Sequence, residues 1–206
     1  MAFRKFKEIG DVLVVYDLEY KVNHFLQPIE VEVPQVLVED LKYVVEKLPY
    51  QASEAAIGEM ILFPILKEVW KNFDEKLMLW SHKTISFTKE LGGIPDYMIA
   101  KQSRRGKVVL DKPLLAVVEA KKDDFGGGWA QCSLEMVTMQ KINNNPLIPI
   151  YGIVSNGDSW EFGKLLGNQF EQMPLPIPLF PIETLYSIVY ALLADCEFQS
   201  QNINSN

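Results

Sequence analysis

The sequence predicts an α/β fold in which a mixed central sheet is flanked by helices. Along the chain, segments with apolar residues at helical spacing alternate with short continuous apolar runs, which are typical of strands. The predicted order is helix, helix, strand, strand, strand, helix, strand, strand, helix, and elements in this order pack as helices on the faces of one sheet. The length of 206 residues suits one domain with a sizeable core.

Two helices are predicted before the sheet core begins. A short apolar run at 12–16 (VLVVY) has the character of a strand. Residues 34–48 open with a proline and keep apolar residues at helical spacing, which predicts the first helix. Ser53 is predicted to cap the second helix, which extends to Phe73 and which Pro64 bends rather than ends.

Three strands and a helix follow. The strands are predicted at 76–88, at 94–101 and at 113–121, and the last two are joined by a polar loop that suits a hairpin. Three glycines, 126–128, then precede a helix at 129–142. These glycines are either a flexible loop or a place where a phosphate backbone comes close.

The C-terminal third completes the sheet and covers it. Its elements are a hairpin of strands 149–155 and 159–166 around Asn156-Gly157, an extended proline-rich connector at 174–181 and an apolar helix at 182–198. The strand at 113–121, the middle helix and the strand at 149–155 suit a right-handed crossover. Residues 199–206 have almost nothing to bury and are predicted to be disordered. One domain is therefore expected over 1–198, with its core at about 53–166.

Charge and cysteine content narrow the class of protein. The net charge of −7 and a pI near 5.0 argue against a body that is a polycation for nucleic acid, so any such contact must be local. The most basic cluster consists of Lys101, Arg104, Arg105 and Lys107, which either neutralises phosphates or forms a plain charged hairpin tip. Two cysteines without a disulfide pattern, and no membrane span or signal peptide, predict a cytoplasmic protein without membrane contact.

Two charges end an otherwise apolar strand. Side chains alternate along a strand, so Glu119 and Lys121 share one face. An unpaired charge on a strand covered on both faces costs on the order of several kcal/mol, so the pair needs partners or a role. A salt bridge at the strand end is the simpler explanation, and a functional site is the other.

A second acid upstream favours the functional explanation. Asp96 follows Pro95 at the start of the strand at 94–101, and its carboxylate can approach Glu119 if the two strands are neighbours. Two such oxygen ligands suit Mg²⁺ or Mn²⁺. Lys121 beside the ion can position or help deprotonate a water, as in metal-assisted phosphodiester hydrolysis. Asp96 is also compatible with simple turn chemistry.

These residues resemble the signature of the PD-(D/E)xK nuclease superfamily. The matching pattern is Gly93-Ile94-Pro95-Asp96, 22 further residues, and Glu119-Ala120-Lys121 on an apolar strand. The resemblance implies a restriction-endonuclease-like fold in which Asp96 and Glu119 ligate Mg²⁺ together with the carbonyl oxygen of Ala120, while Lys121 assists the water.

The resemblance also implies a glutamate on the helix before the first strand. Glu54 matches it in position, and Glu59 is the competitor. Five residues turn Glu59 by roughly 140° around the helix, so both cannot point into the site easily, and Glu54 is favoured. Glu54 at a first helical turn is equally explained by its interaction with the helix dipole.

A glutamine after the catalytic strand extends the likeness. Nuclease domains similar to the RecB type carry a Gln-x-x-x-Tyr pattern there, and this chain has Gln131 with Glu135 in place of the tyrosine. The two lie one helical turn apart on one face. Gln131 is therefore a candidate catalytic residue or a plain polar one, and the resemblance covers roughly 53–155.

The leading hypothesis is a Mg²⁺-dependent nuclease that hydrolyses phosphodiester bonds of nucleic acid, and DNA is the expected substrate. The alternative is a catalytically inactive nuclease-like module that dimerises or binds a protein partner, and a small-ligand-binding α/β protein is a third class. His24 and His82 have no sequence neighbours that indicate a triad. The apolar helix at 182–198 is either core or a subunit interface.

Overall fold

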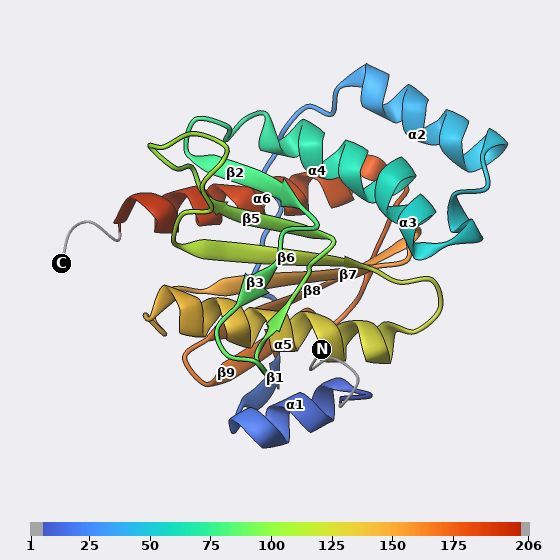
Figure 1. Cartoon of the computed structure of the whole chain (residues 1–206). Coiled ribbons are helices and arrows are strands. Elements are labelled where there is room, and N and C mark those ends of the chain that lie inside the picture. Colours follow the sequence, from blue (N-terminus) through green and yellow to red (C-terminus); the bar gives the residue numbers. More distant parts are fainter. Residues whose placement is uncertain (1–5, 203–206) are drawn as a thin grey trace.

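One mixed sheet organises the chain in the computed structural model, which describes residues 6–202 (Figure 1). Its strand order is β1-β9-β8-β7-β6-β5-β2, and β10 also pairs with β8. The β6–β7 and β1–β9 pairs are parallel and the others are antiparallel. The strands are β1 (Glu19–Val22), β2 (Leu77–Ser81), β5 (Tyr97–Lys101), β6 (Leu114–Ala120), β7 (Ile150–Ser155), β8 (Ser159–Leu166), β9 (Gln169–Gln172) and β10 (Ile177–Pro178).

Helices cover both faces of this sheet, as the sequence predicts (Figure 1). On one face α5 packs against β6 and β7, with α1 and the small β3–β4 hairpin packed against α5. On the other face lie α2, the α3–α4 helix and α6. The bounds are α1 (Ile9–Tyr16), α2 (Gln35–Lys47), α3 (Glu54–Ile57), α4 (Phe63–Trp70), α5 (Phe125–Asn143), α6 (Ile182–Asn202), β3 (Ile85–Ser86) and β4 (Gly92–Gly93).

Strand β6 is buried along its whole length, which explains its continuous apolar run. It lies between β5 and β7, and α5 connects it to the parallel strand β7, so the predicted crossover unit is present. The predicted hairpin of β7 and β8 is also present, and Gly157 in its turn has a φ of 91°.

The strand predicted at 12–16 is wrong, because these residues belong to helix α1. Ile9, Val12, Leu13 and Tyr16 pack at helical spacing against the core on the α5 side. The Asp11 carboxylate accepts hydrogen bonds from the Lys7 and Glu8 amides and so caps the helix start. The valines favour a strand by propensity, but packing against α5 decides the conformation.

The strand predicted at 76–88 is interrupted. His82 has a φ of 49°, so β2 ends at Ser81 and the chain turns before β3. The strand predicted at 94–101 begins three residues later, at Tyr97, so Asp96 lies just before it rather than inside it.

The long helix predicted at 53–73 follows the expected path. Ser53 Oγ accepts a hydrogen bond from the Ala56 amide at 3.1 Å and caps α3. A π-helical turn at Gly58–Leu62 then leads directly into α4, and the helix continues through Pro64 to Trp70.

The C-terminal helix is longer than predicted. Helix α6 extends to Asn202, so the expected disorder is wrong for residues 199–202, and residues 203–206 lie outside the described part. Ser200 is buried and donates to the Glu197 carbonyl at 2.7 Å, while Asn202 donates to the Phe198 carbonyl. These polar side chains therefore satisfy their hydrogen bonds on the helix itself.

Candidate functional site

The predicted acids meet where β5 begins and β6 ends, close to α3 and the start of α5 (Figure 1). Tyr97 pairs with Val118 across the antiparallel strands, so the register places Asp96 opposite Glu119. Asp96 Oδ2 accepts a hydrogen bond of 2.8 Å from the Ala120 amide. The Asp96 carboxylate is thereby fixed to the end of β6.

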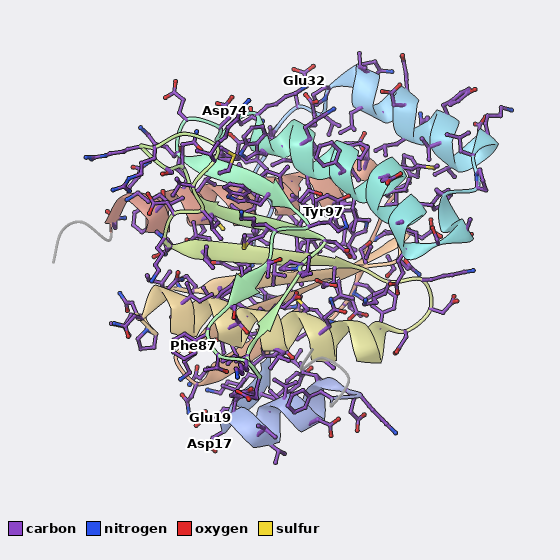
Figure 2. The ribbon with its side chains drawn as sticks, viewed as in Figure 1. Asp17, Glu19, Glu32, Asp74, Phe87 and Tyr97 are labelled. Carbon is purple, nitrogen blue, oxygen red and sulfur yellow. The ribbon has the colours of Figure 1, made fainter. Side chains whose placement is uncertain are left out.

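Tyr97 anchors this corner of the sheet to a helix. Its side chain lies between β5 and the α3–α4 helix (Figure 2), and its ring stacks on Phe63 with centroids 5.8 Å apart. A Cβ atom at Gly58 would lie 3.2 Å from the Tyr97 hydroxyl, so a glycine in the π turn lets the ring approach. The position of Asp96, next in the chain, follows from this packing.

Lys121 connects three elements. Its side chain is only 13% exposed, and Nζ lies 3.1 Å from Gln131 Oε1, 3.6 Å from Glu54 Oε2 and 3.8 Å from Glu119 Oε2. An ammonium group has three hydrogens to donate, and these three oxygens come from α5, α3 and β6. The structure therefore brings together Glu54, Gln131, Glu119 and Lys121. Asp96, just before β5, is hydrogen-bonded to the neighbouring residue Ala120.

Helix α5 starts closer to the site than predicted. The glycines at 126–128 form its first turn, so a flexible loop there is wrong. Asp124 caps the helix by accepting a 2.8 Å hydrogen bond from the Gly127 amide. A Cβ atom at position 128 would lie 2.7 Å from both Lys121 Cγ and Val154 Cγ1, so Gly128 makes room for the lysine.

Glu119 is fully buried, and so is Glu135 on α5. None of the four carboxyl oxygens makes a hydrogen bond of good geometry, but the two carboxyl groups lie close enough to share a proton and Gln131 lies beside Glu135. Burial, and next the neighbouring carboxyl of Glu135, raises the pKa of Glu119 well above its ordinary value, and Lys121 opposes this. Burial likewise raises the pKa of Glu135 to about 7. Glu135, whose role the sequence left open, is thus part of the same group of acids.

His82 also lies at this site, which the sequence did not indicate. Its Nε2 is 3.5 Å from Asp96 Oδ1, its Nδ1 is 2.8 Å from Ser81 Oγ, and its amide donates to the Asp96 carbonyl. Ser81 pairs with Tyr97 in the β2–β5 register, which puts the next residue opposite Asp96. Only the pairing of β2 with β5 could have predicted this contact.

The donor set fits a hard divalent cation. The four carboxyl oxygens of Glu119 and Glu135 accept no hydrogen bond of good geometry from the described residues. Carboxylate oxygens are ligands that Mg²⁺ prefers. Within residues 6–202 no three His, Cys, Asp or Glu side chains converge into a complete metal cluster. Mg²⁺ keeps several waters and needs only one or two carboxylates from the protein, so this arrangement is compatible with its binding.

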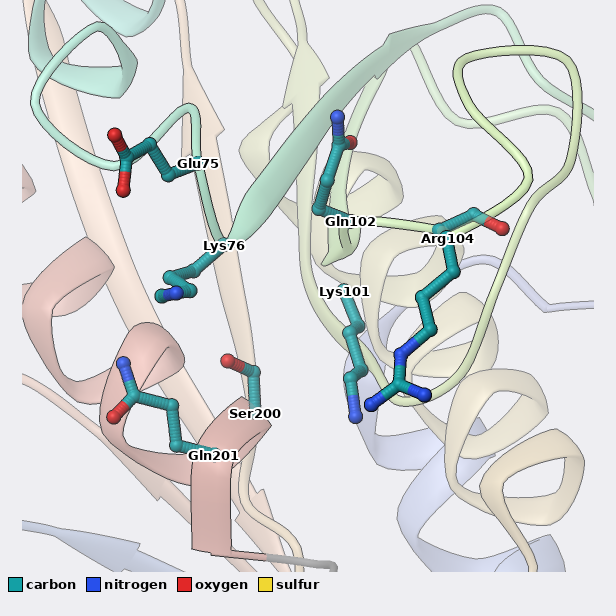
Figure 3. A pocket seen from close by; sticks show the side chains of 8 residues that line it. Glu75, Lys76, Lys101, Gln102, Arg104, Ser200 and Gln201 are labelled. Atoms are coloured by element: carbon teal, nitrogen blue, oxygen red, sulfur yellow. The ribbon is translucent and has the colours of Figure 1, made fainter.

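The basic cluster lies at the other end of the sheet. Lys101 ends β5, five residues from Asp96, which is about 17 Å along a strand. Arg104, Arg105 and Lys107 follow in the exposed loop to β6. Lys101 and Arg104 face a pocket of about 510 Å³ that Lys76 and the end of α6 also line (Figure 3). The structure therefore does not bring this cluster to Asp96 and Glu119.

A smaller pocket lies beyond the C-terminal end of β6. It has a volume of about 310 Å³ and is lined by Gln51, Ile57, Lys122, Asp123 and Asn156. Its residues come from the chain before α3, from α3 and from the loops that follow β6 and β7. It thus lies past the C-terminal ends of β6 and β7 rather than beside the basic cluster, and none of the candidate site residues lines it.

Two further properties of the chain bear on its class. Cys132 and Cys196 are free and buried. No helix among the described residues combines the length and apolar character that crossing a membrane requires.

No protein-family model matches the chain, and a search of curated proteins gives no significant match.

Proposed function

We propose that this protein is a Mg²⁺-dependent nuclease with a restriction-endonuclease-like fold. The observation that carries the proposal is the position of Lys121. Its largely buried ammonium lies 3.1 to 3.8 Å from oxygens of Glu54, Glu119 and Gln131. A lysine held among acids at a strand end costs desolvation energy that a plain scaffold does not need.

The order of elements supports the fold. The α3–α4 helix carries Glu54 and precedes β2, β5 and β6, which pair in antiparallel order. Helix α5 then leads to the parallel strand β7. The resemblance implies such a helix with a glutamate before the first strand, and Asp96, just before β5, lies opposite Glu119 near the end of β6.

Asp96, Glu119 and the carbonyl oxygen of Ala120 would hold the cation. Once bound, Mg²⁺ supplies Lewis acidity to a phosphodiester and lowers the pKa of a bound water. Mn²⁺ has the same ligand preference and is expected to substitute. The hydrogen bond from the Ala120 amide keeps Asp96 in place when the cation is absent.

Lys121 serves the attacking water and the phosphoryl oxygens. Its ammonium can donate a hydrogen bond to a water or offset the charge that develops on the phosphate. Glu54 and Gln131 orient the ammonium from two different helices, so its position is fixed before substrate binds.

The substrate is nucleic acid, and DNA is the form we propose. The chain has a net charge of −7, so its contacts with phosphates must be local or supplied by a partner or a second copy. Lys101, Arg104, Arg105 and Lys107 provide one such surface, in which Lys101 lies about 17 Å from Asp96 along β5. A duplex would have to extend across this distance to touch both.

The test is metal-dependent cleavage of plasmid and oligonucleotide DNA and of RNA by the purified chain. Cleavage is expected with Mg²⁺, with none in EDTA and none with Lys121→Met, which keeps an unbranched side chain one atom shorter and removes the ammonium group. Circular dichroism checks that the variant folds. A folded wild-type protein that binds neither Mg²⁺ nor Mn²⁺ and cuts no nucleic acid contradicts the proposal.

A second candidate is a nuclease-like module that binds a partner or dimerises without catalysis. The observation that favours it is exposed apolar surface near the N-terminus, where Val14 is 83% and Val15 is 60% exposed. Strand β1 is also an edge strand whose Tyr20 and Val22 are exposed. Size-exclusion chromatography with light scattering, together with the cleavage assay, separates the two candidates.

A further inference from the structure

Helix α5 carries one polar group that its own structure does not explain. The helix is buried over most of its length between the sheet and α1. Its other buried polar side chains are all hydrogen-bonded to main-chain carbonyls: Ser133 to Ala130, Thr138 to Leu134 and Gln140 to Gly167. Glu135 is fully buried, and neither of its oxygens makes a hydrogen bond of good geometry, although the Glu119 carboxyl and the Gln131 amide lie beside it.

Glu135 lies on the same side of α5 as the proposed site. It follows Gln131 by four residues, which places both side chains on one face of the helix. Gln131 contacts Lys121 at 3.1 Å, and the Glu135 carboxyl group is close enough to Glu119 to change its ionisation. The buried carboxyl groups of Glu119 and Glu135 therefore lie next to each other.

No salt bridge among the described residues reaches Glu135, although Lys121 is near enough to lower the pKa of its carboxyl group. Lys121 is the nearby ammonium, and its three short contacts go to Gln131, Glu54 and Glu119. A buried carboxylate without a cation or donors is strongly destabilising, whereas an apolar residue would pack well in its place. The glutamate is therefore explained by something that binds to it.

We propose that Glu135 is a cation-binding carboxylate, which together with Glu119 holds a hard divalent cation, Mg²⁺ or Mn²⁺, directly or through a water. The assignment rests on the proposed nuclease function and adds a third acid to its metal site. Glu135 stands where the sequence departs from the Gln-x-x-x-Tyr pattern, so the acid is a feature of this chain. Its oxygens are ligands of the type that both cations prefer.

The experiment measures Mn²⁺ binding without any substrate. Isothermal titration and the electron paramagnetic resonance of free Mn²⁺ give the affinity for wild type, Glu135→Gln and Glu135→Leu. The leucine variant keeps a similar volume and needs no hydrogen bond, so it serves if the glutamine variant folds poorly. The matched control is Glu161→Gln, because Glu161 already accepts hydrogen bonds from Trp129 and Gln172.

The expected result is a loss of Mn²⁺ affinity of about tenfold or more in both Glu135 variants, with Glu161→Gln unchanged. The rise in melting temperature that Mn²⁺ causes in wild type should shrink in the same variants. Equal affinity in wild type and both Glu135 variants overturns the assignment and leaves the proposed function standing. Failure of wild type to bind Mn²⁺ and Mg²⁺ overturns the proposed function and the assignment with it.

Discussion

Gly128 packs directly against Lys121, and a Cβ atom at position 128 would lie 2.7 Å from Lys121 Cγ. Gly128→Ala should therefore displace the lysine, although alanine favours a helix more than glycine does by about 1 kcal/mol. A displacement of about 1 Å at a catalytic group can cost about 100-fold in rate, so we expect a large fall in kcat. Steady-state cleavage kinetics measure it.

Gly126, in the same first turn of α5, supplies the control for that substitution. A Cβ atom at Gly126 would meet only Asp124 Oδ1, at an ordinary 3.5 Å, so Gly126→Ala should keep full activity and gain some stability. Equal activity in Gly128→Ala and wild type would show that Lys121 needs no fixed position.

Glu54 and Glu59 allow a matched comparison on one helix. Glu54 is paired with Lys121 at 3.6 Å, so Glu54→Gln should loosen the ammonium and reduce cleavage by about tenfold. Glu59 is exposed, and Glu59→Gln should leave cleavage unchanged. Both substitutions are expected to change the free energy of unfolding by less than about 0.5 kcal/mol, because both side chains are at the surface. The reverse order of activities would assign the helical glutamate to Glu59.

The buried acids predict an unusual dependence of stability on pH in the absence of divalent cations. Burial raises the pKa of Glu135 in the folded protein to about 7, against 4.5 ordinarily. The folded state then binds more protons than the unfolded state, so this stability is present below pH 4.5 and is lost as the pH rises through about 7. The difference corresponds to about 3 kcal/mol.

Urea unfolding in EDTA at pH 5 and pH 8.5 measures this effect. Glu135→Gln should gain stability relative to wild type as the pH rises, by a difference that approaches about 3 kcal/mol. Glu161→Gln should follow the wild-type profile. If the profiles of wild type and Glu135→Gln run parallel, Glu135 does not titrate in this range.

The basic cluster makes a separate prediction about binding. Replacing Arg104 and Arg105 by alanine removes two exposed charges from the loop that follows β5, at the end of that strand opposite to Asp96. For duplex DNA we expect the slope of log affinity against log salt to fall by about 1.8, with Mg²⁺ affinity unchanged. Fluorescence anisotropy at several salt concentrations tests this. An unchanged slope would assign the cluster to a solvated hairpin tip.

Strand β6 and its charged end were the most predictable parts of the molecule. An apolar run covered on both faces has a strong sequence pattern, and Glu119 and Lys121 interrupt it at a fixed spacing. The approach of Asp96 to Glu119 could be predicted because β5 and β6 are consecutive strands, and consecutive strands usually pair. The meeting of these residues thus followed from local patterns.

Other parts depend on contacts between distant segments. Helix α1 contains a valine-rich run that resembles a strand, and only its packing on α5 makes it helical. His82 reaches Asp96 because β2 pairs with β5 in a particular register. Gly128 is required within helix α5 because Lys121 and Val154 occupy the space that a side chain would fill. No local pattern encodes these long-range requirements.

The edge formed by β1 and β9 has a consequence for how the protein folds. The Tyr20 hydroxyl on β1 donates a hydrogen bond to Gln172 Oε1 on the adjacent strand β9, and 152 residues separate the two in the chain. Closing so large a loop carries a high entropic cost, so this pairing should form after the more local contacts of β5, β6 and α5. We therefore expect the amides of Glu19–Val22 to gain protection from hydrogen exchange later during refolding than those of β6.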